Sequence, residues 1–231
     1  MKRLRKSWQT VIEVLKMSKI TIDLGEDEYG LFTSFTAPHP KYRIFKKKQL
    51  GVALLKLQGT FEEFMAGKEK QVIRTNSSKS KKTGYTFSVV DPFKYIDDII
   101  EIHSSTKERQ NQQVNPVYLD KDELKKYFQQ FPFVFAVIDG KKKMKAYAHI
   151  IYCHDVAIVS RLMGHSDDLK NGIMYYLLSE TVGELLYKKK KSEKPTWLMY
   201  DTFFGAFGGL RYFKERVGFH PYNVKWKKNE D

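Results

Sequence analysis

The sequence contains a single cysteine, Cys153, in 231 residues, which excludes an internal disulfide. A lone cysteine is typical of proteins from reducing compartments, so we expect a cytoplasmic protein. No stretch of the chain approaches the roughly 20 apolar residues that a membrane-spanning helix requires. The basic start of the chain is interrupted by Gln9, Thr10 and Glu13 and has no small-residue cleavage site, which argues against a signal peptide.

Several catalytic signatures are also absent. The chain has no G-x-S-x-G motif, no phosphate-binding loop of the G-x-x-x-x-G-K-[ST] type and no pairing of a cysteine with a histidine that would indicate a thiol nucleophile. The histidines His149, His154 and His165 do not have metal-ligand spacing on one helix. We therefore expect no metal site, and we interpret Cys153 as a small core residue in a strand.

Acidic residues are scarce relative to basic ones: 27 against 41, a net charge of +14. Two interpretations stay open. The lysines could simply solvate loops, or they could form an electropositive surface for a polyanion such as tRNA, an acidic carrier protein or nucleotide phosphates. The basic clusters are Lys46–Lys48, Lys79–Lys82, Lys141–Lys143 and Lys188–Lys191.

The first third of the chain has weak secondary-structure signals. Apolar residues at helical spacing predict a short helix over residues 7–17, and strands are expected at Ile20–Leu24 and Gly51–Leu57. Thr60 is expected to cap a helix over residues 61–66. The polar and basic stretch Thr75–Thr83 is interpreted as an exposed loop or helix end.

From Tyr85 onward the pattern is regular. Asp139-Gly140 between two apolar runs is a strong hairpin signal, and it predicts antiparallel pairing of Phe133–Ile138 with Met144–Tyr152. Antiparallel strands followed by a β-α-β unit indicate an α/β (α+β) fold, a mixed and mostly antiparallel sheet flanked by helices. The other elements expected are strands at 85–90, 156–163, 196–203 and 222–226 and helices opening at Asp91-Pro92 and Asp120 and spanning 172–187 and 210–217.

This order of elements resembles the GNAT acyltransferase fold, most clearly over residues 133–226. In that family, a glycine-rich turn at a helix N-terminus holds the pyrophosphate of coenzyme A. Gly172 matches one glycine of the family pattern, whereas Leu169 and Met174 stand at its other key positions, and an ordinary capped helix is the alternative interpretation. By this resemblance the cofactor-binding residues are Met163, Gly164, Lys170, Asn171, Gly172 and Ile173.

A second set of residues resembles the FemAB-like branch of that superfamily. Residues 209–219 read glycine-leucine, then phenylalanine-lysine, then glycine-phenylalanine, and residues 57–64 are similar to the entry segment of FemAB-like domains. The resemblance implies that Lys214 lies beside the acyl carbonyl and stabilises an oxyanion or a leaving oxygen. A surface lysine on an amphipathic helix is the alternative. Arg109 stands where that branch often has an arginine, which makes it a substrate-binding candidate.

The strand expected at 196–203 ends in further candidates. Tyr200, Phe203 and Phe204 could line an acyl or acceptor pocket or form a core-facing turn. Asp201 is a candidate general base, since the pKa of a buried carboxylate rises, although it could equally cap the next helix. His165 is a secondary candidate base.

Three functions stay open. The first is N-acyl transfer from a CoA or carrier-protein thioester to an amine, with acetyl-CoA or acyl-CoA as co-substrate and an acyl carrier protein as partner. The second uses aminoacyl-tRNA as the donor, and the third is a non-catalytic binding module. We expect an acyltransferase domain at residues 57–231 and a partial domain or arm at 1–56, which could also support a homodimer.

Overall fold

The computed structural model of the chain describes residues 14, 16–26, 29–106, 108–109, 112–113, 115–130, 133–204, 206 and 208–228. The chain forms two compact units, and neither is continuous in sequence. Unit 1 consists of residues 1–57, 152–158 and 188–231, and unit 2 of residues 58–151 and 159–187. The chain passes from unit 1 to unit 2 at Leu57, close to the expected boundary, and the division into an arm and an acyltransferase domain stays a prediction. The helix expected at residues 7–17 lies almost entirely outside the described residues.

Unit 1 contains the beginning and the end of the described chain. Its first strand pairs in parallel with the last one, from Lys19 opposite Asn223 to Asp23 opposite Lys227. The last strand also pairs with β2 in antiparallel orientation, and β2 pairs antiparallel with β9. The elements of unit 1 are β1 (Lys19–Asp23), α2 (Leu31–Thr36), β2 (Val52–Lys56), β9 (Trp197–Thr202), α8 (Gly208–Val217) and β10 (His220–Lys227).

Unit 2 contains a four-stranded part of the sheet and most of the helices. β3 pairs antiparallel with β6, and β6 pairs antiparallel with β7, which confirms the hairpin expected at Asp139-Gly140. The elements of unit 2 are α3 (Phe61–Met65), α4 (Gln71–Lys82), β3 (Thr86–Val90), η1 (Pro92–Tyr95), α5 (Ile96–Ser104), β4 (Glu108–Arg109), β5 (Gln112–Gln113), η2 (Pro116–Leu119), α6 (Lys121–Gln130), β6 (Val134–Ile138) and η3 (Ser166–Asn171).

Three elements carry residues of both units: β7 (Met144–Cys153), β8 (Val156–Gly164) and α7 (Ile173–Ser192). β8 pairs in parallel with β9 over Val156–Ile158 and Trp197–Met199. The hydrogen-bonded strand order is β1-β10-β2-β9-β8-β7-β6-β3. The expected fold class, a mixed and mostly antiparallel sheet with flanking helices, is confirmed.

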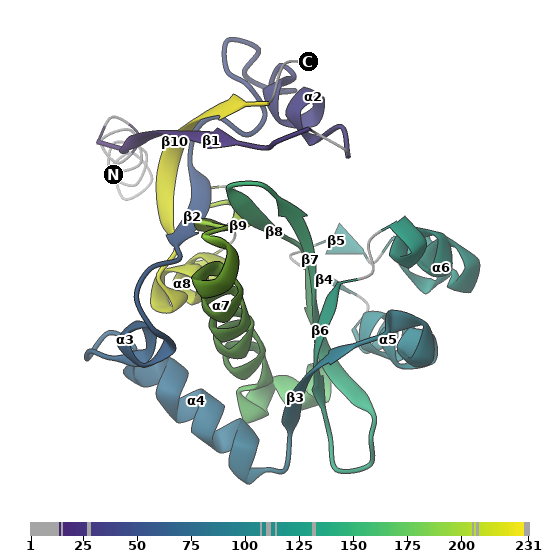
Figure 1. Ribbon diagram of the computed structural model, residues 1–231. Coiled ribbons are helices and arrows are strands. Elements are labelled where there is room, and N and C mark those ends of the chain that lie inside the picture. Colours follow the sequence, from purple (N-terminus) through teal and green to yellow (C-terminus); the bar gives the residue numbers. More distant parts are fainter. Residues whose placement is uncertain are drawn as a thin grey trace, which may run out of the picture. The chain divides into compact units, whose positions relative to one another are not determined.

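Helices cover both faces of the sheet in unit 2 (Figure 1). α5 and α6 pack their apolar sides on one face, where Ile99, Leu124, Phe128 and Tyr147 are fully buried. α4 and α7 cover the other face. Because both faces are buried, β6 reads as a continuous apolar run rather than an alternating one.

One segment differs from the sequence expectation. Thr75–Thr83, interpreted as an exposed loop or helix end, lies largely within the twelve-residue helix α4. Two of its serines are buried on the side of α7, where the Oγ atoms of Ser77 and Ser179 lie 3.2 Å apart. Ser80 donates a hydrogen bond of 2.7 Å to the carbonyl oxygen of Asn171. On this buried side of α4, serine side chains with hydrogen-bond partners therefore occupy positions that apolar side chains take in an ordinary amphipathic helix.

Candidate functional site

Lys214 is the most deeply buried lysine in the described part of unit 1, with 1% of its surface exposed. It lies on α8, and its Nζ donates hydrogen bonds of 2.7 Å to the carbonyl oxygen of Tyr200 and 2.8 Å to that of Thr202. The interpretation of Lys214 as a surface residue is therefore wrong. Lysine is almost never fully buried without partners, and here two carbonyls fix the ammonium group at the end of β9.

The environment of Lys214 shifts its protonation. The pKa of Lys214 is lowered from 10.5 to about 8: burial is the largest cause, Lys48 also lowers the pKa, and Asp201 partly opposes both. An ammonium group has three N–H donors, and two of them point to carbonyl oxygens. A lysine with a pKa near neutrality can both stabilise a developing negative charge and deliver a proton, which is the behaviour expected of a catalytic group.

Asp201 lies directly after Tyr200 in β9, with its backbone in the left-handed region at φ 53°. A non-glycine residue with this conformation is strained, and strain of this kind concentrates at functional sites. Its side chain is 58% exposed and forms an ion pair with Lys48. The premise that Asp201 is a buried carboxylate is therefore wrong. Its contacts favour an electrostatic role beside Lys214, and its role as a base stays a prediction.

The aromatic residues around Lys214 form a packed group. The Nζ of Lys214 lies 4.4 Å from the ring centroid of Tyr200, and burial raises the pKa of that tyrosine. Phe203, at 3% exposure, faces the core, and its ring centroid lies 5.8 Å from that of Phe204. Arg211 places its Cζ 5.1 Å from the Phe203 ring and 5.5 Å from the Phe204 ring. Four of the predicted residues thus meet in unit 1 together with Lys214.

The turn expected to bind a pyrophosphate lies in unit 2. It consists of η3, which follows β8, and of Gly172, which adopts the left-handed conformation at φ 77° immediately before α7. Helix α4 packs on this turn. A Cβ on Gly172 would lie 2.7 Å from the backbone oxygen of Asn76, and Lys79 donates a hydrogen bond of 2.6 Å to the carbonyl of Lys170. Carbonyl oxygens of the turn are therefore engaged by side chains of the chain itself.

Side chains also fill the space at the start of the turn. A Cβ on Gly164 would lie 2.5 Å from the Sδ atom of Met174 and 3.0 Å from a methyl group of Leu169. These two residues stand where the GNAT pattern has other residue types. Ile173 is fully buried, and Met163 packs against the core beneath α5 and α6. The start of α7 is therefore closely packed at its glycines, unlike an open pyrophosphate-binding turn.

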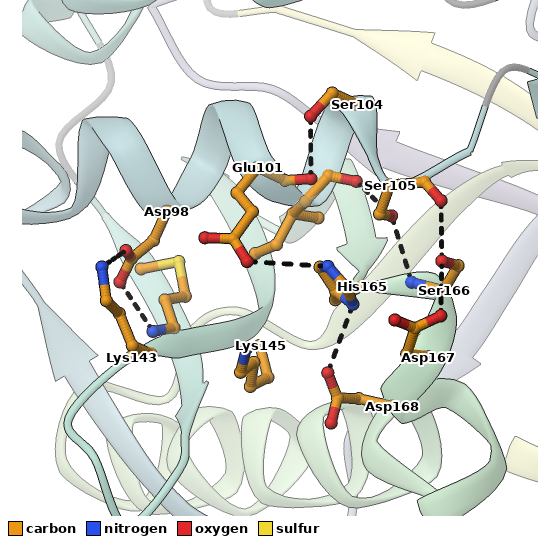
Figure 2. Close-up of polar contacts among 12 residues, drawn as sticks. Asp98, Glu101, Ser104, Ser105, Lys143, Lys145, His165, Ser166, Asp167 and Asp168 are labelled. Carbon is orange, nitrogen blue, oxygen red and sulfur yellow. Dashed lines mark hydrogen bonds and ion pairs between the residues drawn. The ribbon is translucent and has the colours of Figure 1, made fainter.

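His165, the secondary candidate base, precedes η3 and lies between two carboxylates, as Figure 2 shows. Its Nε2 is 3.7 Å from a carboxylate oxygen of Glu101, and its Nδ1 is 3.3 Å from one of Asp168. Asp168 also accepts a hydrogen bond from the hydroxyl of Tyr85. The backbone N–H of His165 donates a hydrogen bond of 2.8 Å to the carbonyl oxygen of Lys145. His165 thus connects α5 with the turn, and its role as a base stays a prediction.

The remaining sequence-derived candidate, Arg109, lies in β4, opposite Gln112 of β5. Its side chain is outside the described part of the chain. The predicted residues therefore fall into two groups: Tyr200, Asp201, Phe203, Phe204 and Lys214 in unit 1, and His165 with the turn of residues 163–173 in unit 2.

Two functional candidates were not identified from sequence. Lys48 lies within an ordinary basic run, and nothing in the pattern connects it with Asp201. Arg161 is a charged residue within the largely apolar strand β8, and that interruption is the signal that could have identified it. Its guanidinium carbon lies 3.5 Å from the ring centroid of Tyr127 and 4.8 Å from that of Tyr118.

Within the described residues, no helix is long and apolar enough to cross a membrane. No group of three or more histidine, cysteine, aspartate or glutamate side chains in the same residues could hold a metal ion.

Comparisons with known proteins identify the fold. The sequence matches no protein-family model and no curated protein. The structure is similar to L-PGS from Bacillus licheniformis (TM-score 0.53, 16% identity, covering 76% of this chain and 61% of that one). It is also similar to FemX (TM-score 0.56, 8% identity, covering 74% and 59%). A third similar structure is the C-terminal domain of a candidate lysylphosphatidylglycerol synthetase from Agrobacterium fabrum (TM-score 0.51, 17% identity, covering 75% and 58%).

At these identities the similarity is one of fold. The chain has a GNAT-type fold with a FemAB-like structural neighbour, as the resemblance of residues 57–226 implied. It spans about three-fifths of the length of the three structures.

Proposed function

We propose that this protein transfers an acyl or aminoacyl group to an amine, with Lys214 as the charged group at the reacting centre. The observation that carries the proposal is the burial of the Lys214 ammonium between two backbone carbonyls at the end of β9, with its pKa lowered to about 8. A purely structural lysine would gain little from this position, because burying a charge is costly. The GNAT-type fold is consistent with the same chemistry.

The proposed reaction needs no covalent enzyme intermediate. The neutral amine nitrogen of the acceptor attacks the carbonyl carbon of the donor, and the carbonyl oxygen becomes an oxyanion. The attacking nitrogen releases one proton to solvent, and the carbonyl re-forms as the bond between its carbon and the oxygen or sulfur atom of the donor breaks. The third N–H of Lys214 stabilises this oxyanion or donates its proton to the departing oxygen or sulfur atom. The ion pair of Lys48 with Asp201 then adjusts how readily Lys214 gives up that proton.

For the donor we favour an aminoacyl ester of tRNA. Two observations support it: Met174 of α7 and Asn76 of α4 pack closely against the glycines of the turn that would hold the pyrophosphate of coenzyme A, and the net charge of +14 favours a polyanionic partner. The name of one structural neighbour, lysylphosphatidylglycerol synthetase, also indicates aminoacyl transfer in that protein. The second candidate donor is a CoA or carrier-protein thioester, because Gly172 retains the left-handed conformation at the start of α7.

Binding experiments separate the two donors. Acetyl-CoA and longer acyl-CoAs are titrated calorimetrically, and aminoacylated tRNA is titrated by fluorescence anisotropy at several salt concentrations. We expect tRNA to bind and its affinity to fall steeply with salt, and we expect no saturable binding of the CoA compounds. Saturable acyl-CoA binding followed by acyl transfer to an amine would replace the tRNA donor with the thioester. Binding of neither donor would contradict the proposed function.

A further inference from the structure

The guanidinium group of Arg161 lies inside unit 2, on the face of the sheet that α5 and α6 cover. Its Cζ is 3.5 Å from the ring centroid of Tyr127, 4.8 Å from that of Tyr118 and 6.0 Å from that of Phe128. The guanidinium plane therefore has aromatic rings as its main neighbours, an arrangement that binds arginine through cation–π attraction. The N–H donors of a guanidinium group lie in its plane, so an acceptor binds at its edge.

That edge is not fully used. The Nη1 atom is buried and has no hydrogen-bond partner in the described part of the chain. No carboxylate among the described residues forms an ion pair with Arg161. A buried donor without an acceptor costs about 1–3 kcal/mol, so native proteins retain such a group mainly where a ligand or a water completes it.

The hydroxyl groups of Tyr127 and Tyr147 hydrogen-bond the Arg161 side chain, and the polar groups here also have other partners that orient them. His103 donates from Nδ1 to the carbonyl oxygen of Tyr118 at 2.6 Å, because a carbonyl oxygen can only accept. In the neutral imidazole its Nε2 therefore accepts, at 2.7 Å, from the hydroxyl of Tyr147. The hydroxyl of Tyr127 lies 2.7 Å from Nδ1 of His149 and 2.7 Å from Oγ of Ser160. The side chains that frame Arg161 are thus held in place before any ligand binds.

We propose that Arg161 and the surrounding tyrosines form a binding site for the carboxylate group of a small molecule. A carboxylate is planar and accepts two parallel hydrogen bonds from a guanidinium edge. Both oxygens of a carboxylate can lie in the guanidinium plane, whereas a tetrahedral phosphate has oxygens that project out of that plane. The site lies within unit 2 and does not depend on Lys214, so it stands or falls separately from the proposed function.

The site is tested with a pair of probes that differ only in one terminal group. N-acetylglycine carries one carboxylate, and N-acetylglycinamide replaces it with a neutral amide. We expect N-acetylglycine to bind saturably in calorimetry and to shift the side-chain nitrogen resonances of Arg161 in the unmodified protein. The amide should bind about tenfold or more weakly, since it lacks the charge-assisted pair. Inorganic phosphate should bind more weakly than N-acetylglycine.

Two variants complete the test. Arg161→Met should abolish binding, and Arg161→Lys should weaken it about tenfold, because lysine retains the charge but lacks the planar fork. Arg216→Met is the matched control: Arg216 also lies over an aromatic ring, 4.8 Å from that of Tyr212, but in unit 1, and its loss should leave binding unchanged. Equal binding of acid and amide, tighter binding of phosphate, or an unperturbed Arg161 resonance would overturn the proposal even if a variant fails to fold.

Discussion

Lys48 and Asp201 form an ion pair across 153 positions of the sequence, and their charges act on Lys214 in opposite directions. Asp201 raises the pKa of Lys214 and Lys48 lowers it, although burial has the largest effect. The pair therefore works as an adjustment of the buried ammonium group rather than as a contribution to stability, since exposed ion pairs contribute little.

Substitutions at the pair should move the pKa of Lys214 in opposite directions. Asp201→Asn removes a negative charge and should lower that pKa below its value of about 8, whereas Lys48→Met should raise it above that value. The change is measured by NMR titration of the Lys214 side chain. Lys47→Met, a neighbouring substitution at an exposed lysine, is the control and should leave the pKa unchanged. Shifts of the same sign in both test variants would contradict this assignment.

Loss of the Lys214 ammonium should impair catalysis more than folding. Lys214→Met should lower kcat by roughly a hundredfold or more, the scale of losing one oxyanion donor. Lys214→Arg should not fully restore activity, because a guanidinium places its charge differently and does not release its proton. Turnover is measured on the donor identified by the binding experiments, at a temperature where circular dichroism shows each variant folded. Unchanged turnover in Lys214→Met would leave Lys214 with a structural role only.

The depressed pKa of Lys214 also predicts how stability depends on pH. Below pH 8 the lysine is protonated in both the folded and unfolded states, and above pH 10.5 it is neutral in both. Between these values the unfolded state retains the proton and the folded state has lost it, so the contribution of Lys214 to the free energy of unfolding rises with pH. In urea titrations the difference in stability between wild type and Lys214→Met should change in favour of the wild type across this window. A difference independent of pH would mean that Lys214 titrates normally.

Gly172 is required for two separate reasons, and three glycines of unit 2 distinguish them. A Cβ at Gly172 would meet both a left-handed backbone and Asn76 at 2.7 Å, at Gly84 it would meet only the left-handed backbone (φ 92°), and at Gly140 neither. Alanine should therefore destabilise most at Gly172, by about 2–4 kcal/mol, and by about 1–2 kcal/mol at Gly84. Gly140→Ala should be close to neutral. The free energy of unfolding in urea gives the order, and equal costs at Gly172 and Gly84 would show that Asn76 moves aside freely.

The hydrogen bond from Ser80 to Asn171 should contribute to the attachment of α4 to the turn. Ser80→Ala removes the donor and leaves a carbonyl oxygen unsatisfied, so we expect a loss of about 1–2 kcal/mol in the free energy of unfolding. Ser78→Ala, at an exposed position of the same helix, is the control. It should be neutral or slightly stabilising, because alanine has the higher helix propensity. Equal effects of the two substitutions would show that the buried hydroxyl contributes nothing.

Helix α4 shows why part of this fold escaped prediction. The strands β6 and β7 follow from apolar runs around Asp139-Gly140, and the helix beginning at Lys121 follows from the cap at Asp120, whose carboxylate accepts from two backbone N–H groups. In α4 the buried side includes Ser77 and Ser80, and an apolar period is the main sequence signal of an amphipathic helix. Buried hydroxyls with specific acceptors are indistinguishable, in sequence, from solvated ones.

The candidate site, like the fold, could be predicted only in part from the sequence. Lys214 could be identified because a resemblance pointed to its position, but its burial could not, since the other basic residues of α8, Arg211 and Arg216, are only partly buried. The exposure of Asp201 and its partner Lys48 depends on pairing of segments far apart in the chain, which no local pattern encodes. Arg161 stood in a strand of mostly apolar residues, and only the positions of Tyr118 and Tyr127 reveal what surrounds it.

The parallel pairing of β1 with β10 determines when β1 can join the sheet during synthesis. Synthesis proceeds from the N-terminus at about 5–20 residues per second, so Lys19–Asp23 must wait for Asn223–Lys227 to emerge from the ribosome before the pair can form. The chain of unit 2 is complete at Tyr187, well before that point. Until then β1 has no partner strand. Unpaired strands of this kind are prone to aggregate or to bind chaperones.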